Sequence, residues 1–234
     1  MKIEIWSDVV CPWCYIGKRR LEHALREFEH ADEVEVAWRS FQLNPDTPVG
    51  TAVPTLDYLT RRFGPQAGQM TGRVAELARG EGLDFDFSTQ LTVNTLDAHR
   101  LLHLAADLGL GDAAKERLLR AHFTEGADLS DHETLVRLAG EAGVDTGRAR
   151  EVLAGREYAD AVQADIELAR AFGASGVPFF VIDRKYGISG AQPAETFLQA
   201  LRTAYADEAA DAGAADASAA GSGAAGPRTS ATPR

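Results

Sequence analysis

The feature that most constrains this chain is the segment Cys11-Pro12-Trp13-Cys14, which holds the only two cysteines among its 234 residues. An apolar, alternating segment typical of a strand precedes it at Ile3–Asp8, and an amphipathic helical pattern follows it. Residues i and i+3 of an α-helix lie one above the other, with Cα atoms roughly 5 Å apart. A disulfide closes across that separation without movement of the backbone. The sequence therefore predicts a cysteine pair that can open and close at the start of a helix.

Composition and charge narrow the class of protein. Hydrophobic residues make up 45% of the chain and charged residues 25%, as in an ordinary globular protein. The net charge of −11 disfavours nucleic acid and anionic membranes as partners, because both select basic surfaces. No apolar run is long enough to span a bilayer, and the first residues lack a signal-peptide pattern. We therefore expect a cytoplasmic protein, in which a Cys-x-x-Cys pair serves redox chemistry or binds a metal.

The expected secondary structure divides the chain into an α/β domain, a helical insertion and a tail. Residues 1–44 and 158–205 carry strand and helix signals in the order β-α-β … α-β-β-α, whereas residues 45–157 are expected to be all-helical. The last residues, 206–234, are almost all Ala, Gly, Ser, Asp, Thr and Pro, so we predict a disordered tail there. The helices expected within the insertion cover residues 55–63, 65–79, 94–109, 130–138 and 145–154.

Position at the helix start predicts different tasks for the two cysteines. The thiolate is the nucleophile, and the positive end of the helix dipole favours a negative charge on Cys11. We expect the pKa of Cys11 to lie below the ~8.5 of an ordinary thiol, and that of Cys14, one turn further in, to be higher. Cys11 would then attack a disulfide and Cys14 would resolve the mixed disulfide. Two unreactive cysteines are the structural alternative, and a metal is not expected because such a site needs about four ligands.

Val177-Pro178 is the second motif, because proline is normally excluded from the interior of a sheet. The X-Pro linkage is the one for which the cis form costs little. With the cysteine motif upstream, we predict a cis bond that leaves the backbone groups of Val177 beside the cysteines, where they can pair with an extended substrate. A trans proline that merely opens the strand is the alternative.

Together these motifs resemble the DsbA-like branch of the thioredoxin fold, and in particular its FrnE-type cytoplasmic members. The resemblance covers about residues 1–205. It implies an α/β thioredoxin fold with a large all-helical insertion, and a thiol–disulfide oxidoreductase with Cys11 and Cys14 as redox pair and Val177-Pro178 as the substrate-facing turn. Some FrnE-type members carry an additional cysteine pair, which this chain lacks. The stretches that carry the resemblance are residues 7–17, 94–100 and 181–193.

The same superfamily contains 2-hydroxychromene-2-carboxylate isomerases and kappa-class glutathione transferases, and this resemblance implies an alternative function. The chain would then be a small-thiol-dependent isomerase or transferase acting on an aromatic small molecule. Retention of both cysteines favours the redox function, which needs no cofactor beyond the redox-active disulfide, although a small thiol is a possible co-substrate. The expected partner is a protein or small molecule that bears a disulfide or thiol, and the expected assembly is a monomer or a homodimer.

Further residues complete the predicted site. Asp8 is expected either to shuttle a proton to the resolving thiol or to cap the loop before the helix. Tyr15 is expected to be exposed beside the cysteines, forming an apolar rim with Trp13. The residues predicted to bind substrate are Pro12, Trp13, Asn94, His99, Val177 and Pro178.

Overall fold

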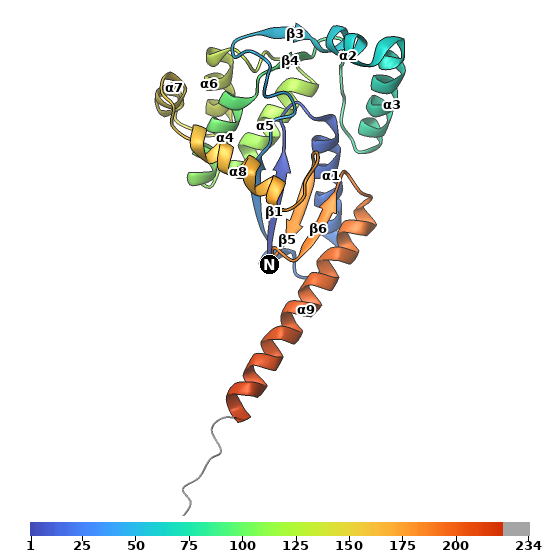
Figure 1. Ribbon diagram of the computed structural model, residues 1–234, viewed down its shortest axis with the longest axis vertical. Helices are drawn as coiled ribbons and strands as arrows, with labels where there is room; N and C mark the ends of the chain where they lie inside the picture. Colours follow the sequence, from blue (N-terminus) through green and yellow to red (C-terminus); the bar gives the residue numbers. More distant parts are fainter. Residues whose placement is uncertain (222–234) are drawn as a thin grey trace, which may run out of the picture.

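The computed structural model describes the backbone of residues 1–221 and the side chains of residues 1–210. A four-stranded sheet with the order β2-β1-β5-β6 lies at the centre of the molecule (Figure 1). The central strand β1 pairs in parallel with β2 and antiparallel with β5, and β5 pairs antiparallel with β6. Strands from the first 40 residues and from residues 179–189 are thereby joined in one sheet. The strands are β1 (Lys2–Ser7), β2 (Glu35–Ser40), β5 (Phe179–Ile182) and β6 (Tyr186–Ser189).

Helices cover both faces of this sheet, as the expected thioredoxin fold requires. Ile3 and Ile5 of β1 pack against α1 (Pro12–Glu27) and α9 (Ala194–Gly221) on one face. Trp6 points to the opposite face, where it packs with α8 (Ala159–Ala171) and its indole N–H donates to the Asp165 carbonyl at 2.7 Å. Because the side chains of β1 alternate between these two covered faces, every residue of the strand after Lys2 is buried.

The insertion is mostly helical and has its own core, built chiefly from α4, α5, α6 and α7. It also contains a short antiparallel pair, β3 with β4, so the expectation of an all-helical insertion is wrong in this detail. Strands of three residues are too short to show a recognisable alternation in the sequence. The elements of the insertion are β3 (Ala52–Pro54), α2 (Thr55–Phe63), α3 (Ala67–Gly80), β4 (Leu91–Val93), α4 (Leu96–Asp107), α5 (Gly111–Phe123), α6 (His132–Glu141) and α7 (Thr146–Ala154). Two 3₁₀ turns, Ala31–Glu33 and Gly64–Gln66, complete the order.

Helix α5, which the sequence patterns did not predict, joins the insertion to the thioredoxin part. Leu119 and Phe123 of α5 pack with Tyr15 and Ile16 of α1. Tyr15 is consequently 3% exposed, and its hydroxyl donates to Glu116 at 2.6 Å, so the prediction of an exposed Tyr15 is wrong. The side of α1 that carries Tyr15 is covered by the insertion.

The C-terminal segment differs from the predicted disordered tail. Helix α9 continues to Gly221, so residues 206–221 are helical, and residues 222–234 lie outside the described residues. Alanine has the highest intrinsic helix propensity, and this explains why the helix continues into an Ala-rich segment. None of the described helices is long and apolar enough to cross a membrane.

Candidate active site

The two cysteines lie at the N-terminus of α1, where it follows β1. Cys11 is the N-cap residue, and the Cys14 N–H donates to the Cys11 carbonyl at 3.0 Å. Pro12 occupies the first helical position, where a missing N–H leaves no helical bond unmade. Both cysteines are free thiols, and they are 3% and 1% exposed respectively. Cys11 is the outer of the two sulfurs, but its exposure is small.

The segment before β5 faces these thiols. The Val177–Pro178 peptide bond is cis, and the Cys11 thiol lies 3.5 Å from the Val177 carbonyl oxygen, to which it donates. The Pro178 carbonyl accepts a hydrogen bond from Gly190 N–H at 2.8 Å, which ties the segment to the end of β6. Because β5 runs antiparallel to β1, the start of β5 lies beside the end of β1. The sheet therefore fixes the position of this turn relative to Cys11.

Gly17 allows α1 to approach this turn. A Cβ atom at Gly17 would lie 3.1 Å from Cγ of Pro178 and 3.3 Å from Cζ of Phe180. Such separations are tighter than ordinary van der Waals contact, so a side chain at this position would push the helix and the turn apart. A glycine inside a helical pattern is the sequence signal that could have pointed to Gly17, which the sequence analysis did not single out as functional.

The pKa values of the two reduced thiols are shifted in the directions opposite to those predicted from the sequence. Burial acts to raise the pKa of Cys14, but the Cys11 thiol and the Lys115 ammonium favour its thiolate, and the net pKa is lowered. The pKa of Cys11 is raised well above its usual value by its hydrogen bond to Cys14, by burial, and by the charges of Cys14 and Asp8. For Cys11, the hydrogen bond with Cys14 and burial thus outweigh the dipole of α1, which was the basis of the prediction.

Asp8 and His99 form a buried pair behind the cysteine loop. His99 Nε2 lies 3.3 Å from Asp8 Oδ1, and Asp8 Oδ2 accepts the Leu43 N–H at 2.8 Å. Burial acts to raise the pKa of Asp8, but the bonds from His99 and Leu43 lower it overall. A carboxylate with a lowered pKa holds no proton at neutral pH, so the geometry favours a loop-fixing role over a proton shuttle. His99 is fully buried, so its side chain does not lie where it could contact substrate, contrary to the prediction.

Asn94 also has a structural role in place of the predicted substrate contact. Its side-chain oxygen accepts from Gln42 Nε2 and from Leu96 N–H, at 3.1 and 2.9 Å. Its side-chain nitrogen donates to the carbonyls of Pro45 and Thr47, at 3.2 and 2.7 Å. Each hydrogen-bonding position of the amide is therefore taken, and none is left for a ligand.

Lys115 is a member of the site that the sequence analysis missed. The side chain is fully buried, its Nζ donates to the Ser7 carbonyl at 3.3 Å, and the same atom lies 5.5 Å from the centre of the Trp38 ring. Burial lowers the pKa of Lys115 to about 8, although the negative charges of Cys14 and Asp8 act to raise it. The helix that carries Lys115 had no recognised pattern, so no local signal marked this residue as buried.

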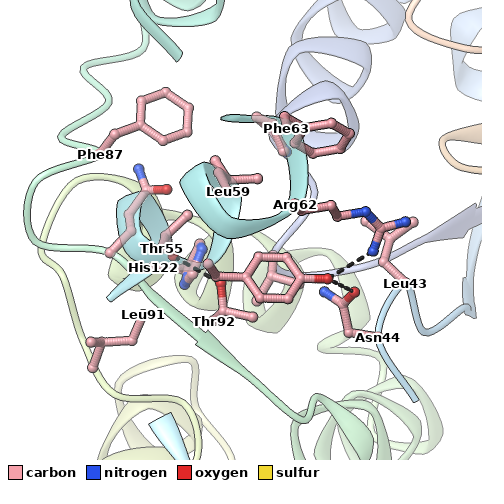
Figure 2. Close-up of a pocket in the computed structure, with 14 residues that line it drawn as sticks. Leu43, Asn44, Thr55, Leu59, Arg62, Phe63, Phe87, Leu91, Thr92 and His122 are labelled. Carbon is pink, nitrogen blue, oxygen red and sulfur yellow. Dashed lines mark hydrogen bonds between the residues drawn. The ribbon is translucent and has the colours of Figure 1, made fainter. Parts of the chain in front are cut away.

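A cavity of about 240 Å³ opens beside the cysteine loop, between that loop and the insertion (Figure 2). Pro12 and Tyr58 form part of its wall, and the Tyr58 hydroxyl donates to Asn44 Oδ1 at 2.8 Å and accepts from Arg62 at 2.8 Å. His122 of α5 lines it as well. The wall is otherwise mainly apolar, and Trp13, beside Pro12 in the chain, is 38% exposed as predicted. The apolar lining comprises Val10, Leu43, Leu59, Phe63, Phe87 and Leu91.

No cluster of three or more His, Cys, Asp or Glu side chains that could hold an ion occurs in the part of the chain that the structure describes. His122 is buried, and burial lowers its pKa to about 4, so its ring is neutral near pH 7. Its Nδ1 has no hydrogen-bond partner among the described residues.

Several known proteins resemble this chain in sequence or in fold. The uncharacterized protein YwbO of Bacillus subtilis is 27% identical over 201 residues, which cover 85% of this chain and 94% of YwbO. The crystal structure of a probable DsbA oxidoreductase from Streptomyces coelicolor is 45% identical, with a TM-score of 0.85 over 88% of this chain and 90% of that one. A 2-hydroxychromene-2-carboxylate isomerase, 14% identical with a TM-score of 0.61 over 90% and 98% of the two chains, shares the fold. Since residues 2–202, from β1 into α9, match the DSBA-like thioredoxin domain, the chain belongs to that family.

Proposed function

We propose that this protein is a thiol–disulfide oxidoreductase in which Cys11 attacks the substrate and Cys14 resolves the mixed disulfide. The observation that carries the proposal is the arrangement of two free thiols one turn apart at the start of α1, with the outer thiol bonded to the carbonyl of Val177. Membership of a family that includes oxidoreductases supports it. The two cysteines carry the two electrons, so the proposed reaction needs no resident cofactor.

The first step uses the contact between the two sulfurs. In the reduced pair the lowered pKa of Cys14 and the raised pKa of Cys11 favour the thiolate at Cys14 and leave the proton on Cys11. As Cys11 attacks a substrate disulfide, its proton passes to Cys14, a bond forms between Cys11 and one substrate sulfur, and the other leaves as a thiolate. Cys14 then loses its proton and attacks Cys11, which releases the second substrate thiol. The substrate gains two electrons and the enzyme becomes a disulfide.

The surroundings of Cys11 support a proposal about its substrate. The cavity beside Pro12 offers an apolar surface, and Trp13 extends that surface outward. A disulfide flanked by an apolar group would place that group in the cavity while its sulfur meets Cys11. Half-buried Val177 offers backbone groups for an extended chain next to the cis proline. We propose a cytoplasmic protein or small-molecule disulfide with an apolar flank as the substrate.

Single-cysteine variants test this proposal directly, because the chain has no other thiol. Cys14→Ser should accumulate a mixed disulfide with a disulfide-bonded model peptide, visible as a mass increase equal to one peptide chain. Cys11→Ser should form no such adduct and should lose disulfide reduction. Comparable adducts on both variants, or full activity of Cys11→Ser, would contradict the assigned roles.

A second candidate is favoured by the cavity alone. An apolar, aromatic-rich space that contains Phe63, Phe87 and the neutral ring of His122 suits an aromatic small molecule processed with a small thiol. Such an isomerase or transferase uses Cys11 without a resolving thiol. Turnover that requires glutathione and survives Cys14→Ser would support this candidate in place of the oxidoreductase.

A further inference from the structure

We propose that Lys115, supplied by the helical insertion, is a positioning residue for Cys14, whose sulfur it holds as a thiolate during resolution. The inference rests on the proposed function, since it assigns a cation to the second step of that reaction. Lys115 transfers no atom and acts through its charge.

The placement of Lys115 leaves its ammonium group with few partners. Its Nζ donates to the Ser7 carbonyl at 3.3 Å and lies over the Trp38 ring at 5.5 Å. No carboxylate among the described residues forms an ion pair with it, and Asp8 is already bonded to His99 and Leu43. A buried ammonium group without a counter-charge is expensive. The negative charges of Cys14, Asp8 and Cys11 all favour the charged form of Lys115, and that of Cys14 acts most strongly.

A second lysine in the same region shows the difference. Lys18 on α1 is also nearly buried, and its Nζ lies 6.0 Å from the centre of the same Trp38 ring. Three carboxylates surround it, those of Glu22, Asp112 and Glu116. The charge of Lys18 is therefore compensated by these carboxylates, whereas Lys115 has no carboxylate in an ion pair with it among the described residues.

Titratable groups from three other parts of the chain surround Lys115. The groups that face it are Cys11, Cys14 and Lys18 from α1, Asp8 from the loop after β1, and His99 from α4. Burial lowers the pKa of His99, so its ring is neutral near pH 7 and does not replace the lysine. The groups that can carry a negative charge beside Lys115 are Asp8 and the two cysteines, and of these only the cysteines change their charge during the proposed reaction.

The resolution step is where this charge matters most. Once Cys11 is bonded to the substrate, it can no longer donate a thiol proton to Cys14, and Lys115 is the cation left beside that sulfur. The Cys14 thiol releases its proton to solvent, its thiolate forms a bond to Cys11, and the bond between Cys11 and the substrate sulfur breaks. The departing thiolate takes up a proton from solvent, so Lys115 ends the step as an ammonium group, as it began.

The size of the effect follows from thiol chemistry. Loss of an adjacent opposite charge shifts a pKa by about one to three units. Each unit lowers the thiolate fraction about tenfold, while the intrinsic nucleophilicity of the sulfur rises about threefold. The net loss is about threefold per unit, so removal of the Lys115 charge should slow resolution near pH 7 by about 3-fold to 30-fold.

Two measurements on the full chain test the proposal. In a Cys11→Ser background, the thiolate absorbance of Cys14 is followed against pH, with Lys115→Met and Lys18→Met as matched variants. We expect the pKa of Cys14 to rise by at least about one unit with Lys115→Met, and by less than about half a unit with Lys18→Met. Equal shifts from the two variants, or none from Lys115→Met, would overturn the proposal. This titration needs no substrate, so a shifted pKa in a protein without disulfide-reducing activity would refute the proposed function alone.

The second measurement keeps Lys115 in place and therefore does not depend on folding of the variant. Salt screens exposed charges far more than buried ones. The pKa of Cys14 in Cys11→Ser protein should therefore change little between low salt and 1 M NaCl. A rise of a unit or more would mean that surface cations hold the thiolate, and the assignment of Lys115 would be wrong.

Discussion

Lowering the pH from 7 to 5 should destabilise the protein through His122, and the substitution His122→Phe should remove that part of the loss. Burial lowers the pKa of His122 to about 4, whereas a histidine in the unfolded chain has a pKa of about 6.5. Between these values the unfolded state binds a proton that the folded state does not. The free energy of unfolding therefore falls as the pH drops below about 6.5, and the loss is complete near pH 4.

The magnitude follows from the two pKa values. At pH 7 the unfolded chain is only slightly protonated at this site, and the group lowers stability by about 0.2 kcal/mol. At pH 5 the same group lowers stability by about 2.0 kcal/mol. Wild-type protein should therefore lose about 1.8 kcal/mol more than His122→Phe over this interval, whatever the other titrating groups contribute. Phenylalanine keeps a flat ring in contact with Phe123 and removes the unpartnered Nδ1.

Urea unfolding of the two reduced proteins at pH 7, 6 and 5, followed by circular dichroism, measures the difference. The two curves of stability against pH should separate by about 2 kcal/mol at pH 5 relative to pH 7. Parallel curves would show that His122 takes up a proton in the folded state. The cavity wall would then carry a charge in acid, contrary to the neutral site assigned to it.

Two other substitutions probe the packing and charge around the cysteines. Gly17→Ala should lower the rate of disulfide reduction and destabilise the protein by about 1–3 kcal/mol, because its Cβ would press on Pro178. The control is Gly72→Ala, at a helical glycine with open space around it. This substitution should stabilise the protein by up to about 1 kcal/mol and leave the rate unchanged. Equal effects of the two, by urea unfolding and turnover, would refute the close approach of α1 to the turn. Lys115→Met should raise stability by about 2 kcal/mol at pH 7, since its charge costs about 3 kcal/mol and its hydrogen bond to Ser7 returns about 1. Between about pH 8 and 10.4 the unfolded state binds more protons at Lys115 than the folded state, so the stability of the wild type recovers as the pH rises. The difference in stability between the variant and the wild type should nearly vanish by about pH 9.5. A difference that does not shrink would contradict the burial of the charge.

The parts of the site that could be predicted from sequence are those with local signals. The strand before Cys11, the proline at the first helical position and the strand after Val177 each show in a few consecutive residues, and their order indicated the fold. The ionisation of the two thiols could not be predicted in the same way. It depends first on burial and on the interaction between the two thiols, and then on the charges of Lys115 and Asp8, which approach the sulfurs from other elements. The helix propensity of the Ala-rich tail was a local signal that compositional reasoning overlooked.

Helix α5 explains why the insertion matters to the chemistry and is more than a cover for the cysteines. Lys115 and His122 are seven residues apart, and in an α-helix residues with this spacing lie on the same face, two turns apart. One helical face thus supplies the cation beneath Cys14 and the neutral imidazole in the wall of the cavity. The packing of Leu119 and Phe123 against α1 fixes the register of both. A change in that packing should alter thiolate stability and ligand preference together, because the two groups cannot move independently along a single helix.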